Sequence, residues 1–499
     1  MNSILTENSL SALEYYFSSF RENTIGIDHS LETVVGKQKL LYADWMECGR
    51  LYAPIEDIVQ NKISTMISTA NSHSNETGKA SRYAYQHAQE LIKMYVNASE
   101  SDVLVATGTS TIDAVSKLQR IMGLRSPDNI INVKLLYDSE RPVVFITHME
   151  HHSNQVSWME TIADVVILPA DKNLLVDPEI LSEALKKYSD RNLKIGSFTA
   201  CSNVTGIITP YYELAKIMHQ HGGLCFVDFT ASAPYVKIDM HPENQEEYLD
   251  AIFFSPYKFL GGPGTSGILV FNKKLYQSNY PDNPGGENVK WTNPWGGYQY
   301  YDTIEIKEDS GTPGFLQVIR TALCFELKEK MGIENIKNRE HELLSLCYDY
   351  FEMIPSAYIL GDKDVERIGC LSFGIFNVHY NLIVRLLNDR FGIQASGGWS
   401  CASTYAHYLF DINEDESKTI TNEIRQEDFT NMPGWVRLSL HPITTNEELI
   451  FICNAINEIA NNYQDWQKSY KYNSSNNEFE LLSGEETIYL DVEKWFYIE

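Results

Sequence analysis

The sequence predicts an α/β protein built around a mostly parallel β-sheet, and three observations carry this prediction. Seven short apolar runs lie between residues 103 and 271. Their near-continuous apolar character suits strands that are buried on both faces of a parallel sheet. Amphipathic stretches such as Tyr212–Gln220 separate several of them, which is a βαβ pattern. The runs are Val103–Ala106, Val143–Thr147, Val165–Leu168, Ile195–Phe198, Leu224–Val227, Ile252–Phe254 and Ile268–Phe271.

A smaller αβ unit is expected after this section. A chain of 499 residues is too long for one hydrophobic core. Helices are predicted over Phe315–Gly332, Glu334–Phe351, Tyr380–Phe391 and Asn446–Ala460, with strands over Leu371–Phe376 and Trp435–Leu440. The expected divisions are an N-terminal segment (1–60, helix-rich to about residue 40) that joins the small domain, a large domain around the sheet (61–330), the small αβ domain (331–465) and an acidic, aromatic tail (466–499) that carries an SSNN linker.

Composition narrows the classes of partner and compartment. The formal net charge of -27 repels nucleic acid and anionic membrane surfaces, so neither is an expected partner. No secretory signal and no membrane-spanning apolar stretch is predicted. The eight cysteines are scattered without CxxC pairs, which argues against a zinc ribbon or a disulfide scaffold. These features favour a reducing cytoplasm.

Two charged residues follow neighbouring apolar runs. Leu224–Val227 leads into Asp228, and Ile252–Phe254 leads into SPYK, which brings Lys258 to the same edge of the sheet. Alone, Asp228 would be a helix N-cap and Lys258 a solvated side chain. Together they are the pair that pyridoxal 5'-phosphate needs, because the lysine forms an imine and the carboxylate keeps the pyridine nitrogen protonated.

A phosphate site is predicted at the end of the first run. Val103–Ala106 continues into TGTST, which includes Thr109 and Ser110, and then into an amphipathic helix. Backbone N–H groups, hydroxyls and the helix dipole at such a turn favour an anion. In isolation the same letters describe an ordinary capping box. The order of the strand-end features favours the phosphate interpretation.

Two further strand ends carry polar groups. Met149-Glu150-His151-His152 follows Val143–Thr147, and adjacent histidines point to opposite sides of an extended chain, so a two-histidine metal site is not expected. One imidazole stacked on a planar cofactor is the better interpretation. Asn203 follows Ile195–Phe198 and can form a hydrogen bond with the phenolic oxygen of the cofactor.

At this point the chain resembles the class V aminotransferase-fold PLP enzymes, in the group of cysteine desulfurases and selenocysteine lyases. The resemblance covers roughly residues 40 to 460. It implies fold type I, with a seven-stranded, mainly parallel sheet in the large domain and a smaller αβ domain built from both chain ends. The matching segments are YADWMECGRLYAPIED, NSHSNETG, ATGTST, MEHHSN, CSNVTG, VDFTASAPY, SPYKFLGGPGTSG, EDSGTPG, SCASTYAH and VRLSLHPITTNEEL.

The resemblance implies a role for each matched residue. On the cofactor, Lys258 is the Schiff-base lysine, Asp228 pairs with the pyridinium, His151 stacks on the ring and relays protons, and Asn203 lies near the phenolic oxygen. The phosphate ligands are Thr109, Ser110, Ser255, Tyr257 and, from the other subunit of a homodimer, Thr312.

On the substrate side, Arg437 clamps the carboxylate, beside Asn203. Cys401 is the nucleophile that takes the sulfur, although a small half-buried hydrophobe is the alternative. His73 lines the pocket entrance or makes a turn.

Four positions depart from the family pattern. Ala231 replaces a glutamine, and Tyr257 replaces a histidine whose phosphate contact a phenol can still make. Ser396 replaces an arginine that helps to position substrate, and bulky Trp399 occupies the same loop. Cofactor binding is expected to survive these changes, whereas substrate choice is open.

The leading hypothesis is a cysteine desulfurase-like enzyme that forms an external aldimine with L-cysteine and leaves L-alanine and an enzyme persulfide. A sulfur acceptor protein is then a further partner. The alternative is another class V reaction on a different amino acid, such as a β-elimination, transamination, epimerisation or biosynthetic step. A scaffold without catalysis is a third hypothesis, which the intact Lys258, Asp228, His151 and Asn203 disfavour.

Overall fold

The computed structural model describes residues 11–68, 74–125, 138–484 and 492–498. Its largest element is a seven-stranded sheet in the order β4-β10-β9-β8-β7-β5-β6. β10 runs antiparallel to both of its neighbours, and the other neighbouring strands run parallel. The predicted α/β class and mainly parallel sheet are confirmed. The strands are β4 (Asp102–Thr107), β5 (Val143–Thr147), β6 (Asp164–Leu168), β7 (Lys194–Thr199), β8 (Leu224–Asp228), β9 (Ala251–Phe254) and β10 (Gly267–Asn272).

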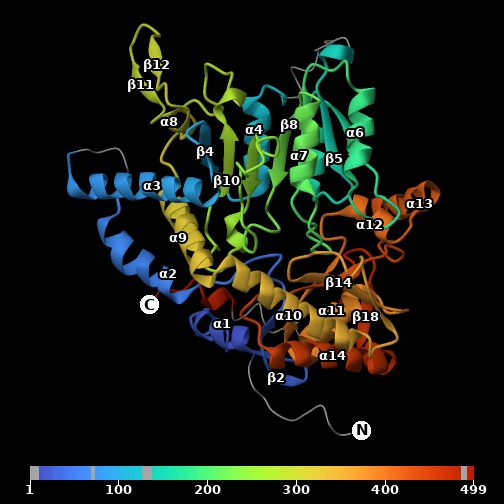
Figure 1. The fold of residues 1–499 in the computed structure, drawn as a ribbon. Coiled ribbons are helices and arrows are strands. Elements are labelled where there is room, and N and C mark those ends of the chain that lie inside the picture. Colours follow the sequence, from blue (N-terminus) through green and yellow to red (C-terminus); the bar gives the residue numbers. More distant parts are fainter. Residues whose placement is uncertain (1–10, 69–73, 126–137, 485–491, 499) are drawn as a thin grey trace.

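Helices cover both faces of this sheet (Figure 1). Alternate strand residues point to opposite faces, so Val144 packs in the same core as α4 and α5, whereas Phe145 packs in the core of α6, α7 and α9. This two-sided burial explains why the seven apolar runs were predictable. The helices are α3 (Glu76–Tyr95), α4 (Thr111–Ile121), α5 (His152–Met159), α6 (Pro178–Lys187), α7 (Tyr211–Gln220), α8 (Ile304–Glu308) and α9 (Phe315–Met331).

A second core lies around a four-stranded sheet in the order β13-β14-β17-β16. Segments from the N-terminal and C-terminal parts of the chain meet here, since β3 (Leu41–Tyr42) pairs in parallel with β15 (Ile393–Gln394). The strands are β13 (Ala357–Ile359), β14 (Cys370–Ile375), β16 (Ser396–Gly398) and β17 (Trp435–Ser439), and the helices of this half are α1 (Ala12–Glu22), α10 (Ile333–Phe351), α11 (Tyr380–Phe391), α12 (Ser403–Leu409), α13 (Glu414–Arg425) and α14 (Asn446–Trp466). α2 (Ala53–Asp57) leads from this half towards α3 (Figure 1).

Three sequence-based expectations need correction. The segment before residue 40 is only partly helical, because β1 (Ser30–Thr33) and β2 (Gly36–Lys39) form a hairpin after α1. α14 continues to Trp466 instead of ending at 460, since Tyr463 and Trp466 pack on the second core. The expected SSNN linker is the turn of another hairpin, between β18 (Tyr470–Asn473) and β19 (Glu478–Leu481). Within the described residues, no helix is both long enough and apolar enough to cross a membrane.

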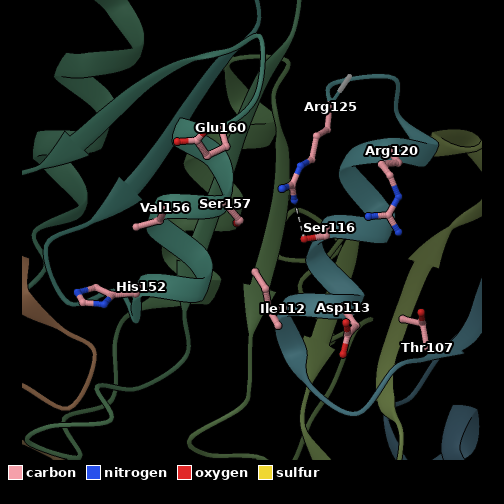
Figure 2. Close-up of a pocket in the computed structure, with 10 residues that line it drawn as sticks. All are labelled: Thr107, Ile112, Asp113, Ser116, Arg120, Arg125, His152, Val156, Ser157 and Glu160. Carbon is pink, nitrogen blue, oxygen red and sulfur yellow. Dashed lines mark hydrogen bonds between the residues drawn. The ribbon is translucent and has the colours of Figure 1, made fainter. Parts of the chain in front are cut away.

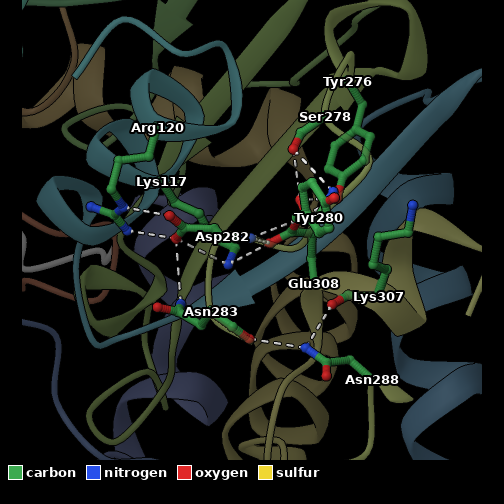
Figure 3. A network of polar contacts seen from close by, with 10 residues as sticks. All are labelled: Lys117, Arg120, Tyr276, Ser278, Tyr280, Asp282, Asn283, Asn288, Lys307 and Glu308. Carbon is green, nitrogen blue, oxygen red and sulfur yellow. Dashed lines mark hydrogen bonds and ion pairs between the residues drawn. The ribbon is translucent and has the colours of Figure 1, made fainter. Parts of the chain in front are cut away.

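A buried network anchors α4, the helix that follows β4 (Figure 3). Lys117 Nζ lies 2.8 Å from Glu308 Oε2 and 3.5 Å from Asp282 Oδ2. Arg120 makes two hydrogen bonds to the Asp282 carboxylate, and the hydroxyl of Tyr276 donates to Glu308 Oε1 at 2.7 Å. The segment 282–308 also forms a protruding hairpin of β11 (Val289–Thr292) and β12 (Tyr298–Tyr300). The network therefore fixes α4 against the base of this arm.

Candidate functional site

A cavity of about 470 Å³ lies where β7, β8 and β9 end, next to the N-terminus of α4. Ligands of open α/β sheets bind at this carboxyl edge. Thus five strand ends and turns, distant in sequence, supply one site. Its lining is Ser110, Thr111, Ile112, His151, Ser153, Thr199, Asn203, Asp228, Thr230, Ala231, Ser255, Tyr257 and Lys258.

Asp228 and Lys258 both face this cavity and both are buried. Asp228 is the last residue of β8, and its Oδ1 accepts a hydrogen bond from the Thr230 N–H at 2.8 Å. Burial raises the pKa of the Asp228 carboxyl, while Thr230 and Lys258 act against that rise. Lys258 ends a short 3-10 turn after β9, and burial together with Arg437 lowers the pKa of its amine. A lowered pKa favours the neutral amine that nucleophilic and proton-transfer chemistry requires.

His151 caps the N-terminus of α5 and reaches the same cavity. Burial, with the positive charge of Lys258 as the next cause, lowers the pKa of His151 to about 4. The imidazole is therefore neutral at pH 7 and can stack on a planar ring or accept a proton. Behind it, the Glu150 carboxylate accepts hydrogen bonds from Thr147 and Thr199 and from the Asn154 amide, which fixes the turn.

The predicted phosphate turn is formed, but Asp113 occupies part of it. Asp113 Oδ2 accepts from the N–H groups of Thr109 at 2.9 Å and Ser110 at 3.2 Å, in a capping box. Ser110 lines the cavity, whereas Thr109 is not among the lining residues. Deeper in, the Ser255 hydroxyl accepts from the Thr111 N–H at 2.7 Å, and the two hydroxyls are 2.8 Å apart. Ser110, Thr111 and Ser255 are thus the hydroxyl groups placed to hold a phosphate.

The loop that carries Cys401 is tied to this cavity by two hydrogen bonds. The Asn203 amide donates to the Ser400 carbonyl at 2.7 Å, and the His152 N–H donates to the Cys401 carbonyl at 2.7 Å. All eight cysteines have free thiols, and Cys401 is the exposed one. Ser400 and Cys401 have backbone φ values of +48° and +54°, which residues other than glycine seldom adopt. Backbone strain of this kind concentrates at functional loops.

Arg437, on β17, is already paired with two carboxylates. Its Nη2 donates to Asp44 Oδ1 at 3.2 Å and to Glu47 Oε2 at 2.8 Å, and its Nη1 donates to the Asn203 carbonyl at 3.2 Å. The Ser396 hydroxyl donates to Asp44 Oδ1 at 3.0 Å, so the residue in place of the family arginine holds one of these acids. Burial alone would raise the pKa of Glu47, but Arg437 outweighs it and the pKa is lowered.

The remaining predicted positions lie as follows. Ala231 and Tyr257 line the cavity. Thr312 is exposed, away from the lining of its own chain, and His73 falls outside the described residues. Trp399 packs on the large core and its ring lies 5.7 Å from that of His407.

Sequence reasoning missed three acids, Asp44, Glu47 and Glu150. The only signal was their presence within the segments YADWMECGR and MEHH.

A larger hollow, of about 1310 Å³, lies beside this site between α4 and α5 (Figure 2). It is bordered by Thr107, which lies just before the turn of Thr109 and Ser110, and by His152, which follows His151. Polar side chains from both helices face it, with Arg125 donating to the Ser116 hydroxyl at 3.0 Å. The exposed apolar side chains Ile112 and Val156 stand at its rim. It is therefore an open surface depression that adjoins the cavity of Lys258, since Ile112 lines both.

Known proteins resemble this chain over most of its length. Residues 53–450 match the model of the family described as aminotransferase class-V. A probable cysteine desulfurase of Halalkalibacterium halodurans is 27% identical over 385 residues, which are 76% of this chain and 88% of that protein. A probable cysteine desulfurase of Staphylococcus aureus strain COL is 25% identical over 414 residues, covering 79% and 94%.

Solved structures share the fold. A cysteine desulfurase from Thermococcus onnurineus superposes with a TM-score of 0.71 at 17% identity, covering 92% of this chain and 100% of that one. A cysteine desulfurase from Escherichia coli gives a TM-score of 0.68 at 20% identity, with coverages of 88% and 97%. The predicted fold type I architecture is confirmed by these neighbours.

The residues present fit the cofactor of this family. A buried carboxylate whose pKa is raised by burial calls for a cationic partner, and a pyridinium nitrogen at Asp228 would be one. Among the residues that the structure describes, the buried Asn203 Oδ1 has no hydrogen-bond partner, so this amide has capacity left for a ligand. Hydroxyls for a phosphate lie at the α4 end of the same cavity. From the family match over most of its length, the chain belongs to the class-V aminotransferase family and is a PLP-dependent enzyme.

Proposed function

We propose that this protein is a cysteine desulfurase-like enzyme, which takes the sulfur of L-cysteine onto Cys401 and leaves L-alanine. The observation that carries the proposal is the anchoring of the Cys401 loop, through Asn203 and His152, to the cavity of Lys258. The names of the relatives from H. halodurans and S. aureus support the same chemistry.

In this proposal, the bound cofactor supplies an electron sink for charge that develops at the substrate Cα. Lys258, whose lowered pKa favours the neutral amine, holds the cofactor and moves the Cα proton through Nζ. Asp228 holds the ring nitrogen, and neutral His151 stacks and relays a proton. Ser110 and Ser255 bind the phosphate with Thr109, Tyr257 and, from a second subunit, Thr312. Arg437 orients the substrate carboxylate, beside Asn203; His73 is proposed for the entrance.

Cys401 performs the sulfur transfer. Its thiolate attacks the substrate sulfur, an S–S bond forms as the Cβ–S bond breaks, and the carbon keeps the electron pair and takes a proton. The products are alanine and a persulfide on Cys401. The positive φ of Ser400 and Cys401 presents the thiol on an exposed loop, where a sulfur acceptor protein can reach it.

The first experiment tests the cofactor and the nucleophile separately. The purified protein should show an imine absorbance band at roughly 400–430 nm, and Lys258→Ala should lose it. With a thiol reductant such as dithiothreitol present to reduce the persulfide, L-cysteine should yield alanine and sulfide, and Cys401→Ala should lose this reaction while keeping the band. Cys48→Ala is the matched control, since Cys48 is half-buried and is not on the loop. Sulfide release by Cys401→Ala at the wild-type rate would contradict the role of Cys401.

A second candidate is another reaction of the same family on a different amino acid, namely β-elimination, transamination or epimerisation. The contact of Glu47 with Arg437 favours it, because a second carboxylate beside Asp44 adds negative charge where the substrate carboxylate would bind, and Ser396 supplies no positive charge there. Spectral screening of the holoenzyme against the common amino acids tests it. A response to another amino acid, with none to L-cysteine, would replace the first candidate.

We also propose a cytoplasmic homodimer with a shared active site. In each subunit, residues 61–330 form the large domain. Residues 331–465 form the small domain together with 1–60, and the tail is 466–499. The exposed Ile112 and Val156, which line the hollow of Figure 2, support an interface there. Light scattering should give twice the mass of the 57.0 kDa chain. A monomer at micromolar concentration would contradict the shared site.

A further inference from the structure

Glu47 is paired with the Arg437 guanidinium that a carboxylate ligand would bind. The guanidinium is 2% exposed, and both contacts of its Nη2 are carboxylates. Nη1 donates to the backbone carbonyl of Asn203. A substrate carboxylate needs two N–H groups of the same fork to bind in the bidentate manner. Arg437 therefore has to lose a present partner before it can clamp a substrate.

The two acids differ in how easily they can leave. Asp44 is 16% exposed, and it accepts a second hydrogen bond from Ser396. Glu47 is 66% exposed, and no further hydrogen bond holds its carboxylate in place among the described residues. Because the Glu47 carboxylate is already largely hydrated, and Asp44 remains to neutralise the buried Arg437, the contact of Glu47 with Arg437 can be exchanged at little cost. Glu47 is thus the exchangeable partner of Arg437.

Gly49 explains why Glu47 lies at this point. The Gly49 N–H donates to the Tyr257 carbonyl at 3.0 Å, which joins the segment 44–50 to the turn of Lys258. A Cβ atom on Gly49 would lie 1.9 Å from the Phe259 carbonyl oxygen, so only glycine permits this approach. The charges of Lys258 and His151, which line the cavity, also act on the Glu47 carboxylate and help to lower its pKa.

We propose that Glu47 is a specificity-determining residue, a carboxylate that occupies Arg437 in the unliganded enzyme and is displaced by the carboxylate of the substrate. The inference deepens the proposed function and rests on it only in taking an α-amino acid as substrate. Substrates that carry a carboxylate compete with Glu47, whereas an amine without a carboxylate leaves the pair intact. Glu47 thereby weakens binding of every carboxylate and keeps Arg437 paired between turnovers.

The test measures binding of a simple probe, propionate, to the holoenzyme by ligand-observed NMR titration. Glu47→Ala should tighten propionate binding by about two- to fivefold, and Glu47→Gln by less, since an amide can still accept from Arg437. Glu32→Gln is the matched control, because Glu32 is exposed on β1, outside the site. Propylamine, which has no carboxylate, should not gain affinity in Glu47→Ala.

Arg437→Gln provides the second arm. In that background, Glu47→Ala should no longer change propionate binding, because the competition takes place on Arg437. Unchanged or weaker binding of propionate by Glu47→Ala in the wild-type background would overturn the proposal. Since propionate carries neither amine nor thiol, this result does not depend on whether the enzyme releases sulfide from L-cysteine. A lack of sulfide release would therefore remove the proposed function and leave this inference standing.

Discussion

Lys117 and Arg437 are both buried cations with two carboxylate partners, yet their surroundings differ. Around Lys117, the side chains of Asp282 and Glu308 are 5% and 0% exposed, so both carboxylate partners of this cation, drawn in Figure 3, are shielded from solvent. Around Arg437, Glu47 is 66% exposed. A closed cluster must stay complete, because each of its charges depends on the others for solvation. An open one can exchange a partner for a ligand, and this separates a structural ion network from a binding site.

The largest effect is expected for Lys117→Met. Removing the cation leaves Glu308 and part of Asp282 buried without their partner, which should cost about 3–5 kcal/mol of unfolding free energy. Denaturant unfolding of the purified protein measures the change. Lys274→Met serves as a control, since Lys274 lies on the surface nearby. A loss below 1 kcal/mol would mean that the network is not the anchor of α4.

A smaller loss of stability is expected for Arg437→Gln, about 1–3 kcal/mol, because the exposed Glu47 regains water when its partner is removed. Its larger effect should be on binding. Losing a charge-assisted clamp should reduce kcat/KM for the amino-acid substrate by about 10- to 100-fold. Steady-state kinetics beside unfolding curves separate the two effects. If Arg437→Gln kept the kcat/KM of the wild type, Arg437 would not be the residue that clamps the substrate carboxylate.

The ion pairs of Asp282 should also be visible in the pH dependence of stability. Burial alone would raise the pKa of Asp282, but Arg120 and Lys117 lower it below its ordinary value of 3.8. A carboxyl with a depressed pKa stabilises the fold above its ordinary value, and that stability is lost as the pH falls through the lower, folded value. The free energy of unfolding of the wild type should therefore fall below pH 3.8. Asp282→Asn should reduce this dependence, and an unchanged curve would contradict the assignment.

The smallest effect is expected for Glu47→Gln, less than about 0.5 kcal/mol of unfolding free energy, because the Glu47 carboxylate is already largely hydrated and Asp44 still neutralises Arg437. Thermal unfolding beside Glu32→Gln measures it. A loss above 1 kcal/mol would place Glu47 in the structural class with Glu308 and remove the distinction between the clusters.

The sheet could be predicted because its strands are buried on both faces, and each strand therefore has a run of apolar residues in the sequence. The strand-end residues Asp228, Lys258 and Asn203 were found for the same reason, since the edge of a parallel sheet gathers consecutive strand ends.

Asp44 and Glu47 could not be found in this way. Their partner Arg437 is some 390 positions away, and no periodic pattern links them. The β18–β19 hairpin was missed because SSNN is equally typical of a linker.

The parallel pairing of β3 with β15 has a consequence for the order of synthesis. Leu41 leaves the ribosome about 350 residues before its partner Ile393. At 5–20 residues per second, the interval is roughly 20–70 s. During this time the segment with Asp44 and Glu47 has neither its strand partner nor Arg437. The large sheet is synthesised completely within the interval, so the substrate pocket is finished only when the C-terminal part of the chain closes over a domain that can already have folded.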